Sequence, residues 1–224
     1  MKVLCYFLAF LCMKPLLSGE ITRSYDLNST KEFVCAGDWK IEIKQTDRNH
    51  LTLTAKEPLL NNLVFSHKTK VLSLSQKAPP LPGTIKGVLE VKDLGKIILN
   101  GNIAIDIDEW KGKKLAIEIN GSSLIEGLLH LEKLSLKING NSQAILKGTA
   151  DTQSVSIAGA GTYSGKNLKT KQSTIDIQGV GTAYVNASDT LNATIAGYGH
   201  IHYVGAPKVY QKITGAGQVS SDEY

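Results

Sequence analysis

Two carboxylates, Asp106 and Glu126, have the type and spacing needed for acid–base chemistry. Each lies five residues after a glycine of a repeat, so both leave the same outer face if the repeats stack as coils. Clustered carboxylates hydrolyse glycosidic bonds or hold calcium in polysaccharide-cleaving enzymes. The next two coils place Ile145 and Ser164 in that column, so the cluster stops at two. A solvated surface is the simpler interpretation, and an acidic site is the alternative.

Histidines and tyrosines near the C-terminus form a second candidate group. His200 and His202 alternate on one expected strand, so both imidazoles point outward, and Tyr184 lies one coil before His202. Zinc or copper needs a third good ligand, and tyrosine is a poor one. We therefore predict no metal site, and a candidate binding patch of Tyr184, Tyr198, His200 and His202. Such rings can stack on sugars, although tyrosine is also common in strands.

Other chemistries find little support in the sequence. Cys35 is expected to be a free, partly buried thiol. Gly159-Ala160-Gly161 lacks the remaining glycine and the helix of a nucleotide fingerprint. The longest basic run is Lys113-Lys114, which does not form a nucleic-acid patch. No cofactor is predicted.

A repeat must position these side chains. The pattern aliphatic, polar, aliphatic, polar, glycine recurs with spacings of 18 to 20 residues. Its glycines are Gly101, Gly121, Gly140, Gly159, Gly179, Gly197 and Gly215. Alternation with period two predicts strands with one buried face, and the glycines suit corners with positive φ. About 19 residues fit one coil of a parallel β-helix and are too few for a helical pair or a propeller blade. The predicted fold is therefore all-β, a right-handed parallel β-helix-like solenoid, with a β-sandwich as the alternative.

Asparagines precede the first three of these glycines. Asn100, Asn120 and Asn139 fall in one column, where their amides could form a ladder from coil to coil. The preference of Asn-Gly for turns explains the same residues without a ladder. Either a ladder or a turn preference accounts for these asparagines.

The sequence outside the repeats divides into two parts. Residues 1–19 have a lysine, an apolar stretch and small residues before Glu20, which is typical of a signal peptide. Its removal lowers the net charge from +5 to +3 and leaves Cys35 as the one cysteine. Residues 20–83 alternate without the glycine pattern, and we expect them to form a β-rich segment capping the repeats of residues 84–224.

The repeats resemble the bacterial family of auto-transporter adhesin head GIN domains. The most specific match is Leu191–Val209, which contains Gly197-Tyr198-Gly199 and Tyr203-Val204-Gly205-Ala206-Pro207, followed by Gly215-Ala216-Gly217. The resemblance covers roughly residues 30 to 220. It implies an exported bacterial β-helix with no established catalytic residues. The family favours serine between the paired glycines, where this chain has Ala160, Val180, Tyr198 and Ala216.

These observations favour an exported, non-enzymatic module for adhesion or binding. It would present a repeated surface to a glycan, an envelope component or a protein, in the periplasm or at the cell surface. A carbohydrate-active enzyme using Asp106 and Glu126 is the second hypothesis, and a structural envelope component is the third. No transmembrane segment is expected once the signal peptide is removed.

Overall fold

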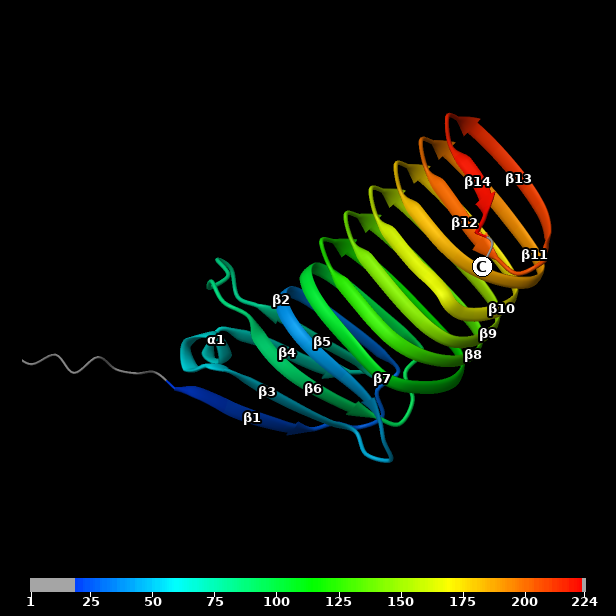
Figure 1. Ribbon diagram of the computed structural model, residues 1–224. Coiled ribbons are helices and arrows are strands. Elements are labelled where there is room, and N and C mark those ends of the chain that lie inside the picture. Colours follow the sequence, from blue (N-terminus) through cyan, green and yellow to red (C-terminus); the bar gives the residue numbers. More distant parts are fainter. Residues whose placement is uncertain (1–18, 223–224) are drawn as a thin grey trace, which may run out of the picture.

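The computed structural model describes residues 19–222, which form a stack of β-coils closed at one end by a smaller sheet (Figure 1). Of the predicted signal peptide, only Gly19 lies within the described residues. The elements of the N-terminal part are β1 (Glu20–Asp26), β2 (Glu32–Gln45), β3 (His50–Lys56), α1 (Glu57–Asn61), β4 (Leu63–Lys68), β5 (Val71–Gln76) and β6 (Ile85–Val91). The others are β7 (Lys96–Gly121), β8 (Leu124–Gly140), β9 (Gln143–Gly159), β10 (Thr162–Gly179), β11 (Thr182–Gly197), β12 (His200–Val204), β13 (Lys208–Gly215) and β14 (Gln218–Ser221).

The long strands β7 to β11 each follow one coil and pair in parallel with the next coil. The register aligns the predicted columns, with Ile119 opposite Ile138 and Gly121 opposite Gly140. The last coil consists of β13, which pairs with β11, and β14, which pairs with β12. The predicted all-β solenoid of coils of about 19 residues is thus confirmed.

The stack begins earlier than the repeat predicts. β2 pairs in parallel with β7, and Gly37 lies opposite Gly101. Between these two adjacent coils, residues 46–95 leave the stack and form most of the cap. β5 and β6 each pair with part of β2, β4 pairs with β5, and β3 and β1 extend the sheet from β6 in antiparallel order. The N-terminal segment therefore covers the edge of the first coil, as expected.

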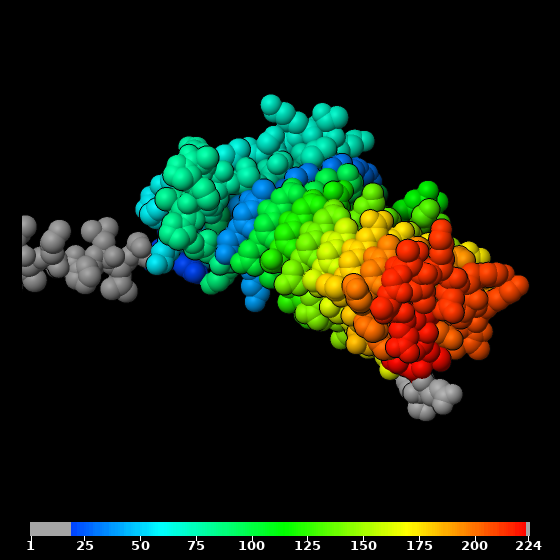
Figure 2. Space-filling model, turned by 90° about the horizontal axis from the view of Figure 1, so that it is seen from above, coloured from blue at the N-terminus to red at the C-terminus, as the bar shows by residue number. Residues whose placement is uncertain are grey.

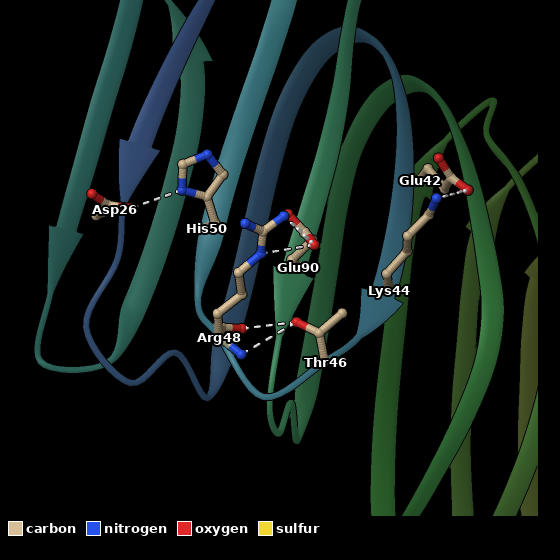
Figure 3. A network of polar contacts seen from close by, with 7 residues as sticks. All are labelled: Asp26, Glu42, Lys44, Thr46, Arg48, His50 and Glu90. Carbon is tan, nitrogen blue, oxygen red and sulfur yellow. Dashed lines mark hydrogen bonds and ion pairs between the residues drawn. The ribbon is translucent and has the colours of Figure 1, made fainter.

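Polar side-chain contacts tie the cap strands together (Figure 3). The Nη2 atom of Arg48 lies 2.7 and 2.6 Å from the two carboxylate oxygens of Glu90. The Nδ1 atom of His50 lies 2.8 Å from an oxygen of Asp26. Exposed pairs contribute about 0–1 kcal/mol each, so the cap depends mainly on its buried leucine and isoleucine side chains.

Close packing of the coils explains the two glycine columns. The glycines of the main column have φ values between +117° and +134°, a region that other residues rarely adopt. The second glycine of the Gly-x-Gly pairs has no such φ. Instead, a Cβ at Gly161, Gly181, Gly199 or Gly217 would meet an isoleucine methyl of an earlier coil at 2.5 to 2.7 Å. Glycine therefore lets the backbone lie directly on the buried isoleucines.

The asparagine ladder is present. Asn120 Nδ2 donates to Asn100 Oδ1 at 2.9 Å, and Asn139 Nδ2 donates to Asn120 Oδ1 at 2.8 Å. The amide oxygens of Asn100 and Asn120 thus each accept from the asparagine of the next coil. The three residues thus do more than favour a turn, because they link three coils through their side chains.

A polar network lies inside the otherwise apolar solenoid. The hydroxyl of the fully buried Tyr163 donates to Gln153 Oε1 at 2.6 Å. Gln153 Nε2 donates to Ser173 Oγ at 2.8 Å, and Ser173 Oγ lies 2.8 Å from Thr170 Oγ1. Thr170 in turn donates to the carbonyl of Asn186 at 2.6 Å. The buried side chains of this network thus satisfy one another, which is a requirement for burying polar groups.

Candidate functional site

Members of both predicted groups, Asp106 and Glu126 from one and Tyr184 and His202 from the other, lie in one row across the outer face of the solenoid. We call this the outer row, and it takes one residue from each successive strand. In order it is Val88, Glu42, Asp106, Glu126, Ile145, Ser164, Tyr184, His202 and Ser220. Neighbouring strands are about 4.8 Å apart. Four such steps separate Asp106 from Tyr184. The two groups are therefore roughly 19 Å apart on one continuous surface.

At the C-terminal end of the outer row, aromatic rings stack along the coils. The ring centroids of Tyr184 and His202 are 4.9 Å apart with an interplanar angle of 14°. His200 and His202 follow at 6.3 Å and 25°. The next residue before Tyr184 in the row is Ser164, and among residues 19–222 the tyrosine ring has no stacking neighbour on that side. A flat ligand could therefore extend the stack there.

Tyr198 does not join this stack. It lies at a corner between Gly197 and Gly199, and 66% of its surface is exposed. Within residues 19–222, no ring contact joins it to the other predicted patch residues. The alternation along β12 brings His200 and His202 to the face, whereas Tyr198 lies outside the strands, between β11 and β12. The structure thus brings three of the four predicted residues together.

Polar neighbours hold His202 in place. Its Nδ1 atom lies 3.1 Å from Ser220 Oγ and 3.2 Å from Asp222 Oδ1, and Lys166 Nζ lies 3.6 Å from the other oxygen of Asp222. A Ser-His-Asp triad requires serine and aspartate on opposite ring nitrogens. Here both contact the same nitrogen, so the arrangement positions the imidazole and cannot activate the serine by that mechanism.

The acidic end of the outer row contains three carboxylates, one more than the sequence predicts. Asp106 lies opposite Glu126, as predicted, and Glu42 precedes them on β2. The alternation of Trp39, Ile41 and Ile43 places Glu42 outward, but its position next to Asp106 depends on the pairing of β2 with β7. Glu42 Oε1 lies 2.9 Å from Lys44 Nζ, and this hydrogen bond raises the pKa of the lysine (Figure 3).

Two shallow hollows flank Asp106 and Glu126. One, of about 440 Å³, extends over β6, β2, β7 and β8 and is also lined by Lys40, Val88 and Leu124. The other, of about 220 Å³, is also lined by Ile145 and Lys147, among others. The larger volume is within the range of small-molecule sites. Among the residues that the structure describes, no group of three potential ligands could hold a metal ion.

Comparison with known proteins identifies the family. Residues 31–207 match the family described as "Putative auto-transporter adhesin, head GIN domain". The chain belongs to this family. A search of curated proteins finds no match.

Solved structures share the head GIN fold at low sequence identity. An adhesin-like protein of Bacteroides fragilis, described as a "putative adhesin", is 21% identical with a TM-score of 0.81, over 91% of this chain and 97% of that one. A "Putative lipid binding protein" of Parabacteroides distasonis is 22% identical with a TM-score of 0.76, over 92% and 98%. A "putative adhesin" of Parabacteroides merdae is 20% identical with a TM-score of 0.72, also over 92% and 98%. These likenesses concern the fold.

Cys35 is a core residue of this head GIN domain. It lies in the inner column of β2 opposite Leu99 and is fully buried, more deeply than the sequence suggests. Burial raises the pKa of its thiol far above the ordinary value. The thiol therefore stays protonated near neutral pH and is not a nucleophile.

No helix within residues 19–222 is long and apolar enough to cross a membrane.

Proposed function

We propose that this head GIN domain is an exported, non-enzymatic binding module that contacts a glycan through the outer row. The observation that carries the proposal is the Tyr184–His202 stack, which ends beside the small side chain of Ser164. An aromatic ring with one free side suits the apolar face of a sugar, while neighbouring hydroxyls and carboxylates can accept or donate hydrogen bonds. The alternative ligands for this surface are an envelope component or a protein.

Repetition supports the same proposal. The outer row continues without interruption from the cap to the last coil, so an extended ligand could contact several coils at once. Several weak contacts on one rigid surface together give stronger binding, because the first contact raises the effective concentration for the others.

The proposed location is the periplasm or the cell surface. The N-terminal sequence pattern supports it, and N-terminal sequencing of the purified protein, expected to begin near Glu20, tests it.

Replacing Tyr184 by alanine is expected to reduce retention on a glycan ligand about fivefold, because one stacking contact is worth roughly 1 kcal/mol. Retention of the purified protein would be measured on immobilised bacterial polysaccharides and peptidoglycan, with thermal melting of each variant as a check on folding. Tyr198→Ala is the matched comparison, since it removes an exposed tyrosine outside the stack. Equal retention of wild type and Tyr184→Ala on every ligand that binds would exclude the stack as the contact surface.

A carbohydrate-active enzyme is the second candidate, favoured by the hollows on both sides of Asp106 and Glu126. If it is correct, incubation with a polysaccharide panel, with and without calcium, releases reducing ends or unsaturated products. Asp106→Asn should then abolish product, because the amide can neither ionise nor exchange a proton. Asp151→Asn, on an exposed carboxylate paired with Lys171, should leave it unchanged. Turnover that Asp106→Asn leaves intact would remove this site from consideration.

A further inference from the structure

In the described part of the chain, the last coil of the solenoid has an uncovered edge. Within residues 19–222, β13 pairs only with β11, and β14 pairs only with β12. Both lie at the end of the stack opposite the cap (Figures 1 and 2). The first coil, in contrast, has β5 and β6 on its edge. An uncovered strand edge offers backbone N–H and C=O groups to another chain.

The side chains of β13 are those of a coil that lacks its next neighbour. Ile213 continues the inner isoleucine column but is 37% exposed, whereas Ile195 in the preceding coil is 1% exposed. Val209 continues the column of Leu191 and is only partly buried. Between these two apolar positions, Gln211 is exposed and replaces the aliphatic residues of earlier coils. The inward-facing side chains of this edge are thus apolar, with one amide between them.

We propose that two copies of this chain associate through this edge, with their β13 strands antiparallel about a two-fold axis at Gln211. Head-to-tail stacking of the coils is blocked, because the cap occupies the edge of the first coil. A two-fold contact uses the same edge of both copies and closes without further growth. The occupant of the edge is therefore a second copy.

Side-chain complementarity selects the register. In an antiparallel pair, opposite residues lie on the same face of the sheet. With Gln211 at the axis, the inward Val209 meets the inward Ile213 of the other copy, and the outward Tyr210 meets Lys212. Each of these pairs occurs twice. The two Gln211 side chains face each other, where their amides can hydrogen-bond as those of the asparagine ladder do.

The neighbouring registers are unfavourable because they bring positive charges together. Centring the pair on Lys212 places that lysine opposite its own copy. Centring it on Tyr210 places Lys208 opposite Lys212. Like charges directly opposite each other destabilise a strand pair, so the charges of β13 exclude the registers on both sides of the proposed one.

This association goes beyond the proposed function and does not depend on it. It would place two Tyr184–His202 stacks on one rigid assembly, so that a repetitive ligand could bind both. Such bivalence raises overall binding strength without a new contact in either copy. The association itself is a property of β13 and is measured without any ligand.

Sedimentation equilibrium of the purified protein is expected to give twice the monomer mass. Gln211→Glu and Gln211→Lys each place like charges at the axis and should weaken dimerisation about a hundredfold. Mixing the two variants places glutamate opposite lysine, and the mixture should again sediment as a dimer. Recovery on mixing also shows that both variants are folded.

The matched control is Gln178→Glu, the same change at an exposed position on β10. It should leave the dimer intact. A monomer at all concentrations, or a dimer that both Gln211 variants preserve, would overturn the proposal. Loss of dimerisation without recovery on mixing would overturn the register with Gln211 at the axis.

Discussion

Gly179→Ala is expected to lower the free energy of unfolding by about 3 kcal/mol, the upper end of the range for a strained backbone. Gly179 has a φ of +127°, and a Cβ there would lie 2.6 Å from the carbonyl oxygen of Gly159 in the preceding coil. The backbone cannot move away, because Gly179 also pairs with Gly197 on the next coil. Urea denaturation followed by circular dichroism measures the change.

Gly95→Ala is the matched control for this prediction. Gly95 has an ordinary φ, and a Cβ there would meet nothing closer than 3.7 Å. Its replacement by alanine should change the free energy of unfolding by less than about 1 kcal/mol, since it mainly restricts the unfolded chain. Equal denaturation midpoints for the two variants would show that the glycine column does not set the packing of the coils.

The same glycine column explains why most of the fold could be predicted. A strand of period two that ends at a glycine every 18 to 20 residues allows few architectures, and its columns align once the coils are parallel. The first coil was missed because residues 46–95 separate Gly37 from Gly101. No local pattern indicates that strands so far apart in the chain are neighbours in space.

The parts of the candidate site that depend on the repeat could also be predicted from the sequence. Strand phase and coil spacing place Asp106 beside Glu126 and Tyr184 beside His202, and both pairs are present. Glu42 was not predicted, because its place in the outer row depends on the missed first coil. The contact between Asp222 and His202 was not predicted either, because it depends on side-chain conformation beyond the last strand.

Buried polar groups escaped prediction for a different reason. By residue type alone, Gln153 and Ser173 resemble outward residues of polar strands. Yet each lies two residues before a buried aliphatic residue, Val155 or Ile175, so the alternation of period two turns both side chains inward. Because polar residue types are normally assigned to the solvated face of a strand, a sequence pattern does not distinguish a satisfied buried network from a solvated surface.

Gln153→Leu is expected to lower the free energy of unfolding by about 2 kcal/mol, although leucine has a similar size, because the buried Tyr163 hydroxyl then lacks its acceptor. Tyr163→Phe should cost a similar amount, since it leaves Gln153 Oε1 unpaired. The double variant removes both partners and should be no less stable than the worse single variant. Urea denaturation of all four proteins then gives a coupling energy of about 1–2 kcal/mol. Additive losses would instead show that the hydrogen bond between Tyr163 and Gln153 does not contribute to the free energy of unfolding.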